Sequence, residues 1–134
     1  MRYPGFSFQE MVNLVYDNNW QLYQVFSDAL LIAIFWEETQ FNNIAQEKGT
    51  AVGLGQVEPR ELWTLKKYGV FTNAKNILNS PAHAVEVTSY YLRHLYESQS
   101  SSKRGQVFPF AFLKLDLGTW PGPSVSNMPV RCTM

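Results

Sequence analysis

Cysteine pairs, an excess of charge and long apolar runs are all lacking from this chain of 134 residues. The lone Cys132 has no second cysteine to pair with, so the chain has no disulfide framework of the kind that stabilises small secreted domains. Eleven basic and eleven acidic residues cancel, whereas nucleic-acid-binding domains usually carry a basic excess. The apolar run from Ala29 to Trp36 is much shorter than the ~20 residues that span a bilayer. We therefore expect neither a nucleic-acid partner nor stable insertion into a membrane.

Motifs for metals, cofactors and nucleophilic catalysis are lacking too. His83 and His94 lie about three turns apart on one predicted helix, which is too far for both to bind one metal ion. There is no glycine-rich phosphate loop, Ser-His-Asp arrangement or internal repeat. We expect no metal and no cofactor. The first residues, MRYPGFSFQEM, lack the regions of a secretory signal, so any export is expected to depend on a removed signal, a parent protein, a secretion system or host lysis.

The composition suits one domain. Hydrophobic residues make up 46% of the chain and aromatic residues 15%, which is enough for a single core. Caps and apolar spacing predict a helix that begins near Phe8 and ends at Asn18 or Asn19, and further helices over 28–38, 60–68, 81–98 and 107–117, the last with a buried strand as the alternative. Residues 99–105 are expected to form a mobile surface loop and residues 119–134 an irregular tail. The predicted fold is mainly α, with a single domain over residues 1–134.

One carboxylate, Glu38, ends a helix that is apolar on nearly every side. The run ALLIAIFW before it predicts a central, buried helix. Leu31, Ile34 and Phe35 precede the glutamate by seven, four and three residues and so share its helical face. An apolar environment raises the pKa of a carboxyl group, as a glycosidase acid requires, although a glutamate at a helix end is more often a solvated charge. The neighbouring Glu37 is rotated by ~100° around the helix and is expected to face solvent.

The residues from Glu38 onward resemble a known motif. Glu38, Thr39 and Phe41 correspond to Glu-Ser-x-Phe. The pattern Ala...Gly-Ala-x-Gly-Leu-x-Gln-x-x-Pro is then matched without a gap by Ala45, Ala51, Val52, Gly53, Leu54, Gln56 and Pro59, and an Asn-Ile...Ala...Tyr-Leu helix by Asn76, Ile77, Ala84, Tyr91 and Leu92. These motifs are typical of lytic transglycosylases of the lysozyme superfamily, and the glycine turn is also similar to that of goose-type lysozymes. The resemblance covers about residues 28–96 and implies a small lysozyme-like helical fold with a substrate cleft.

The chain departs from the family pattern in two places. The family has Ala-Tyr-Asn-x-Gly in a later helix, and the best counterpart here, KLDLG around Asp116, lacks the tyrosine. Tyr90 or Tyr91 is the candidate replacement. Thr50 stands at a common glycine and Glu47 at a common serine, which adds a second carboxylate to the loop.

The resemblance implies roles for individual residues. Glu38 is the expected catalytic residue, with Glu47 as a second carboxylate. Gln56 lies in a turn whose glycines permit close approach of the backbone, so it is expected to hydrogen-bond sugar groups, or else to stabilise the turn. Gly53 serves backbone geometry in that turn. The expected substrate-binding residues are Gln56, Thr39, Gly53, Tyr91, Tyr90 and Asp116.

The implied activity is cleavage of the β-1,4 link between N-acetylmuramic acid and N-acetylglucosamine in peptidoglycan. In lytic transglycosylases one glutamate protonates the bond and then deprotonates the muramyl C6 hydroxyl, which leaves a 1,6-anhydro end. A hydrolase needs a second carboxylate, for which Glu47 is the first choice before Glu58 and Asp116. The sequence is also compatible with action on chitin-like polymers and with a catalytically inactive glycan-binding domain. We expect a monomer that binds glycan strands at the bacterial cell wall, in the periplasm or outside the cell, with an inhibitor or immunity protein as partner if it is a toxin.

Overall fold

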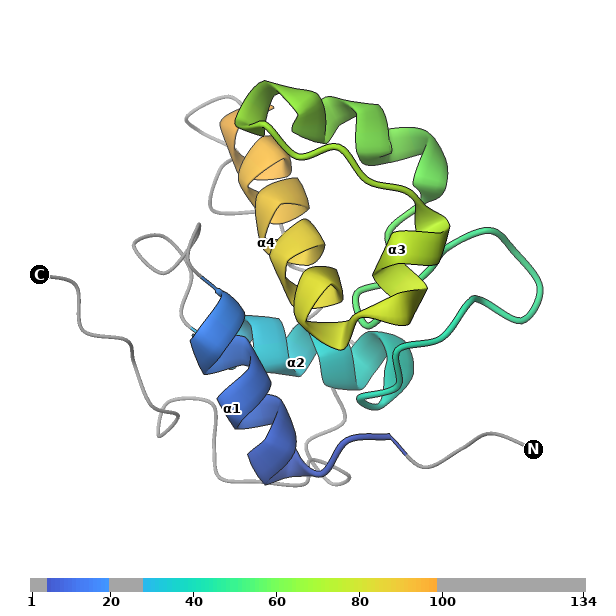
Figure 1. Ribbon diagram of the computed structural model, residues 1–134. Helices are drawn as coiled ribbons and strands as arrows, with labels where there is room; N and C mark the ends of the chain where they lie inside the picture. The colour runs from blue at the N-terminus through green and yellow to red at the C-terminus, as the bar shows by residue number, and fades with distance from the viewer. Residues whose placement is uncertain (1–4, 20–27, 99–134) are drawn as a thin grey trace, which may run out of the picture.

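A computed structural model describes residues 5–19 and 28–98, which form a mainly helical body (Figure 1). The elements in chain order are α1 (Phe8–Asn18), α2 (Asp28–Thr39), the 3₁₀ helix η1 (Pro59–Tyr68), α3 (Ala74–Asn79) and α4 (Pro81–Ser98). Within the described residues β pairing is limited to isolated bridges. None of the described helices combines the length and apolarity needed to cross a membrane. The prediction of a mainly α fold is confirmed.

Helix boundaries agree with the prediction where capping residues determine them. Ser7 and Glu10 form a capping box, in which the Glu10 N–H donates to Ser7 Oγ at 3.1 Å and the Ser7 N–H donates to Glu10 Oε1 at 2.8 Å. Pro59 begins η1, and Gly69 ends it with a left-handed φ of +78°. The start of α1 and both ends of η1 therefore follow from local sequence.

Between η1 and α4 the chain forms α3, which was not predicted as a separate helix. Its six residues are too few to show a helical period, and its local signal is the cap, where Asn73 Oδ1 accepts from the Asn76 N–H at 2.9 Å. The predicted helix over 107–117, the loop over 99–105 and the tail over 119–134 lie outside the described residues.

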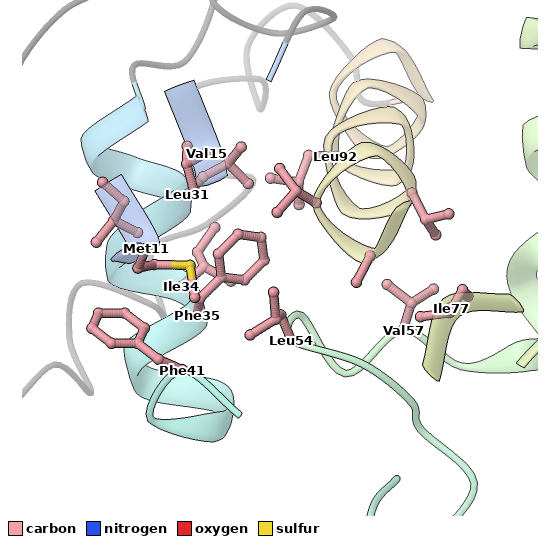
Figure 2. Close-up of a cluster of buried hydrophobic side chains, with 14 of the residues drawn as sticks. Met11, Val15, Leu31, Ile34, Phe35, Phe41, Leu54, Val57, Ile77 and Leu92 are labelled. Atoms are coloured by element: carbon pink, nitrogen blue, oxygen red, sulfur yellow. The ribbon is translucent and has the colours of Figure 1, made fainter. Parts of the chain in front are cut away.

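Helix α2 is the central, buried helix that the sequence predicts. Every residue from Ala29 to Phe35 is at most 6% exposed. Figure 2 shows the Phe35 side chain among apolar side chains from other segments, including Met11 of α1 and Leu54 of the loop that follows α2. Burying an apolar side chain of this size contributes about 1.5–3 kcal/mol. The core therefore anchors the body of α2 and fixes where its last turn, which carries Glu38, emerges.

Helix α4 packs against α1, α3 and η1 (Figure 1). Its contact with η1 includes aromatic and charged side chains: Tyr68 OH of η1 donates to Glu97 Oε2 at 2.9 Å. Within α4, Arg93 Nε donates to the other oxygen, Glu97 Oε1, at 2.7 Å. The Arg93 guanidinium also lies over the Tyr68 ring, 4.8 Å from its centroid. Burial and the hydrogen bond to Glu97 raise the pKa of Tyr68 to about 12, so its hydroxyl keeps the proton that it donates.

We predict that acid weakens this contact between η1 and α4. Lys67 Nζ lies 2.8 Å from His94 Nδ1, a hydrogen bond that requires a neutral imidazole because both nitrogens of a protonated one are donors. Burial and the charge of Lys67 lower the pKa of His94 from 6.5, and the hydrogen bond from Arg93 lowers the pKa of Glu97 from 4.5. The unfolded chain therefore takes up both protons at a higher pH than the folded protein does, so the free energy of unfolding falls as the pH drops through these two values.

Thermal melting between about pH 8 and about pH 4 measures this effect. The melting temperature should fall by a few degrees as the pH passes below 6.5, and again below 4.5. In a His94→Asn variant the first of these two declines should disappear while the second remains. A melting temperature that is constant across the whole range would contradict the prediction.

Candidate active site

Hydrogen bonds fix the end of α2, which carries Glu38. Thr39 Oγ1 lies 3.1 Å from the carbonyl oxygen of Phe35 and 3.0 Å from that of Leu54, so this hydroxyl joins the last turn of the helix to the loop that follows it. Thr39 is only 2% exposed. Its hydroxyl proton is used within the protein, and the residue positions its neighbour Glu38 relative to the loop.

The two residues after α2 turn the chain sharply. Gln40 and Phe41 have φ values of +51° and +68°, a left-handed conformation that is uncommon for residues other than glycine. Phe41 is held there because its side chain is buried, its N–H donates to the Phe35 carbonyl at 3.3 Å and its carbonyl accepts from the Phe6 N–H at 2.9 Å. Strained backbone of this kind occurs often beside active sites. The segment before α1 thus fixes the turn that follows Glu38.

The loop over residues 44–57 folds back on itself through antiparallel bridges from Ala45 to Val52 and from Val52 to Val57. Gly53 lies in its turn with a φ of +84°. A Cβ atom at this position would lie 2.6 Å from Ile77 Cγ2 of α3, so both the backbone and the packing require glycine here.

Asn43 connects this loop to α3, and the sequence did not single it out. Its Oδ1 accepts from the Leu54 N–H at 3.0 Å, and its Nδ2 donates to the Ile77 carbonyl at 2.9 Å. An asparagine can serve both partners because it carries an acceptor and two donors. Its carbonyl partner is 34 residues away in the chain, so no local pattern reveals this role.

Glu38 lines a cavity of about 520 Å³ next to this loop. The other lining residues are Thr39, Ile44, Ala45, Gln46, Glu47, Lys48, Ala51, Gln56 and Glu58. Together with Glu38, the described lining residues include three glutamates, and Lys48 is the one cation among them. A cavity of this size with several polar side chains suits a polar ligand such as a sugar. The structure thus brings together Glu38, Thr39, Glu47 and Gln56, which the sequence analysis had assigned to one site.

Glu38 is less buried than the sequence predicts. The residue is exposed, although Phe35 on the same helical face and the next residue, Thr39, are both buried. Glu37, which was predicted to face solvent, is half-buried, and it does not line the cavity. The cavity, rather than burial, therefore distinguishes Glu38 from its neighbour.

Gln56 lines the cavity with an amide whose N–H groups are already used. Its Nε2 donates to the carbonyls of Ile44 at 3.0 Å and Gly53 at 2.8 Å. Two carbonyl partners fix the orientation of the amide, because only its nitrogen can donate to both. The amide thus stabilises the turn, and its Oε1 is left to accept a hydrogen bond from a ligand hydroxyl or N–H.

Two further carboxylates lie on the cavity wall. Glu47 is exposed, and Glu58 is half-buried and accepts a hydrogen bond from Thr50 Oγ1. Thr50, which replaces a glycine of the family pattern, therefore gives Glu58 a partner. Asp116, the third candidate for the second carboxylate, lies outside the described residues. Over 5–19 and 28–98 no group of three His, Cys, Asp or Glu side chains is arranged to hold a metal ion.

The two candidate tyrosines on α4 have different surroundings. Burial raises the pKa of Tyr91, and so do the negative charges of Glu61 and Glu58, so Tyr91 lies within electrostatic range of a residue of the cavity wall. Tyr90 instead packs against Tyr68 of η1, with the ring centroids 5.5 Å apart. Neither tyrosine lines the cavity of Glu38, and Tyr91 is the one whose pKa responds to a charge of the cavity wall.

The family to which these features belong follows from a comparison of the whole sequence. A family model described as "Transglycosylase SLT domain" matches residues 16–108, which is most of the chain. The chain belongs to the transglycosylase SLT domain family. The match confirms the resemblance to lytic transglycosylases, and the helical body is the fold expected of such a lysozyme-like domain. Neither the curated proteins nor the solved structures gave a match.

The cavity belongs entirely to the SLT domain. The matched range begins near the end of α1 and includes α2, the loop over 44–57, η1, α3 and α4. All the residues that line the cavity of Glu38 fall within it. Because SLT domains are transglycosylases of peptidoglycan, the chain is assigned to peptidoglycan-directed enzymes of the cell wall.

Proposed function

We propose that this SLT domain is a lytic transglycosylase that cleaves the β-1,4 link between N-acetylmuramic acid and N-acetylglucosamine, with Glu38 as its general acid and base. The observation that carries the proposal is that Glu38 lines a polar cavity of about 520 Å³ within the family's matched range, whereas Glu37 does not. Thr39 and the strained turn after α2 hold the glutamate on the wall of that cavity.

The reaction needs one carboxyl group in two protonation states. Glu38 first donates its proton to the glycosidic oxygen, the bond from the muramyl C1 to that oxygen breaks, and the N-acetylglucosamine end leaves with a free hydroxyl. The muramyl C6 hydroxyl then attacks C1, and its proton passes to the Glu38 carboxylate. The product is a 1,6-anhydro ring, and the glutamate returns to its starting state without any water being consumed.

Because Glu38 is exposed to solvent, the bound substrate itself helps to keep its carboxyl group protonated. A glycan strand that fills the cavity displaces water from around the carboxyl group, and the loss of solvation favours the protonated form that starts the reaction. Gln56 Oε1 is positioned by the bonds of its own amide to accept a hydrogen bond from a sugar. Tyr91 is the proposed replacement for the tyrosine that the family motif has near its glutamate.

Hydrolysis is the second candidate, because Glu47 and Glu58 line the same cavity as Glu38. An inverting hydrolase uses a second carboxylate ~6.5–9.5 Å away to activate water, and a retaining one uses a nucleophile at ~5–5.5 Å. Glu47 is the stronger candidate of the two, because Thr50 already occupies an oxygen of Glu58. The third candidate is a glycan-binding domain without activity.

Mass spectrometry of the soluble products separates these possibilities. Purified peptidoglycan incubated with the wild-type chain should release muropeptides with 1,6-anhydro ends, and Glu47→Gln should release them too. If the wild-type chain instead releases products with reducing ends, and Glu47→Gln does not, the activity is hydrolysis and the transglycosylase proposal is wrong. If the chain releases nothing from peptidoglycan that another muramidase digests, the enzyme proposal is overturned and the binding domain is supported.

A further inference from the structure

A second cavity, of about 340 Å³, lies where η1 meets the segment before α3. Its lining residues are Pro59, Leu62, Trp63, Lys66, Val70, Phe71, Thr72, Asn73 and Ala74. Trp63 and Phe71 are 67% and 73% exposed, although both are large aromatic residues. Exposed aromatic side chains that flank a hollow are typical of binding surfaces, where they supply a large contact area.

The 3₁₀ geometry of η1 sorts its side chains into faces. With three residues per turn, side chains at i and i+3 lie one above the other, which places Arg60, Trp63 and Lys66 on a single face. All three are exposed, while Leu62, Thr64 and Leu65 of the same helix are buried. The one carboxylate between them in sequence, Glu61, is 36% exposed and lies 4.0 Å from Arg60 Nε. The exposed face of η1 thus carries the Trp63 ring between the cations Arg60 and Lys66, and Phe71 follows this helix in the chain.

The polar groups of this second cavity are mainly hydrogen-bond donors. None of its described lining residues is acidic, whereas the first cavity is lined by three glutamates, Glu38, Glu47 and Glu58. The oxygen of the Asn73 side chain already accepts from the Asn76 N–H at 2.9 Å, so its N–H groups are what it can offer a ligand. The ammonium group of Lys66 and the indole N–H of Trp63 are donors as well. Such a surface suits a ligand with carboxylate and carbonyl acceptors and a flat apolar face.

We propose that Arg60, Trp63, Lys66 and Phe71, here called the η1 surface, bind a peptidoglycan strand at a second site outside the catalytic cavity. The C–H face of an N-acetyl sugar stacks on the aromatic rings, and the carboxylates of the lactyl and peptide groups pair with the cations. The choice of polymer rests on the proposed function. Glu58 lines the catalytic cavity and its chain neighbour Pro59 lines the second one, so one strand can contact both.

A second site of this kind strengthens the binding of long and insoluble substrates. Two linked contacts hold a polymer longer than either contact does alone, because the second binding event occurs at a high effective concentration. Loss of the η1 surface should therefore impair binding and cleavage of intact cell-wall sacculi, while cleavage of fragments too short to reach it should be unchanged.

The experiment uses the full chain with Glu38→Gln, which is expected to bind sacculi without digesting them. Co-sedimentation with sacculi is compared between this parent and a variant that also carries Trp63→Ala and Phe71→Ala. We expect binding that is about ten- to hundredfold weaker. Tyr16→Ala, which removes an aromatic residue of α1 that is 50% exposed, is the matched control and should bind as the parent does. Lys66→Glu alone should also weaken binding, and should do so less for chitin, which has no carboxylates.

Each outcome has a separate meaning. Unchanged binding by the Trp63 and Phe71 double variant, with circular dichroism showing a folded protein, overturns the η1 surface even if anhydro products confirm the proposed function. If the double variant binds more weakly but the wild-type chain releases no products from peptidoglycan, the η1 surface is supported and the proposed activity is overturned. A double variant that binds normally but sediments as a smaller species than the parent would identify the surface as a contact between copies of the chain, and this too overturns the proposal.

Discussion

Replacement of Glu38 by glutamine is expected to lower the release of soluble products from peptidoglycan by about 10²–10⁴-fold, the range that a general acid and base contributes. Glutamine keeps the size of the side chain and its capacity to hydrogen-bond, but it cannot give a proton to the glycosidic oxygen. The rate of product release by mass spectrometry, with thermal melting of the same preparation, measures the effect. Because Glu38 is exposed at the end of α2, we expect the variant to fold as the wild type does.

Glu37→Gln is the matched control for this experiment. Glu37 carries the same charge one residue earlier on the same turn of α2, but it does not line the cavity. Both substitutions remove a negative charge from the C-terminal turn of a helix, where the helix dipole disfavours it, so folding should tolerate both. Glu37→Gln should keep activity close to that of the wild type. Equal losses in the two variants would show that the charge of the helix end matters rather than proton transfer, and full activity in Glu38→Gln would falsify the assignment.

Local signals explain which parts of the fold could be predicted. The capping box of Ser7 and Glu10 and the proline that begins η1 act within one turn of chain, and their bonds form in the structure as the sequence indicates. The apolar run of α2 is equally local, because a helix that is apolar on every side can only be stable in a core. By contrast, six residues cannot display a helical period, which is why α3 was not predicted.

The sequence grouped residues that share a cavity only in part. Glu38, Thr39, Glu47 and Gln56 were assigned to one site and line one cavity, whereas Gly53, Tyr90 and Tyr91, assigned to the same site, do not line it. The predicted burial of Glu38 was wrong because helical periodicity shows which residues share a face, but not where the core beneath that face ends. The support from Asn43 depends on a carbonyl 34 residues away, and such a contact exists only once α3 has packed against the loop.

The substitution Gly53→Ala is expected to lower the free energy of unfolding by about 2–5 kcal/mol. A left-handed φ of +84° costs a residue with a Cβ about 1–2 kcal/mol. The new Cβ would also lie 2.6 Å from Ile77 Cγ2, and overpacking of this kind costs about 1–3 kcal/mol more. Activity should fall as well, because the Gly53 carbonyl accepts one of the hydrogen bonds that orient Gln56. Denaturant unfolding and product release on the same samples measure both effects.

Gly69→Ala separates the two causes, because Gly69 has nearly the same conformation without the contact. Its φ is +78°, yet a Cβ there would meet no atom within 4 Å. It should therefore lose only the backbone part, about 1–2 kcal/mol, and keep its activity, since η1 ends there away from the loop over 44–57. If the two alanine variants lose equal stability, Ile77 must yield without cost and Gly53 is required only for its backbone conformation. A larger loss of stability at Gly53 would show that Ile77 of α3 packs tightly against the turn that carries Gln56. The packing of α3 would then help to position the site.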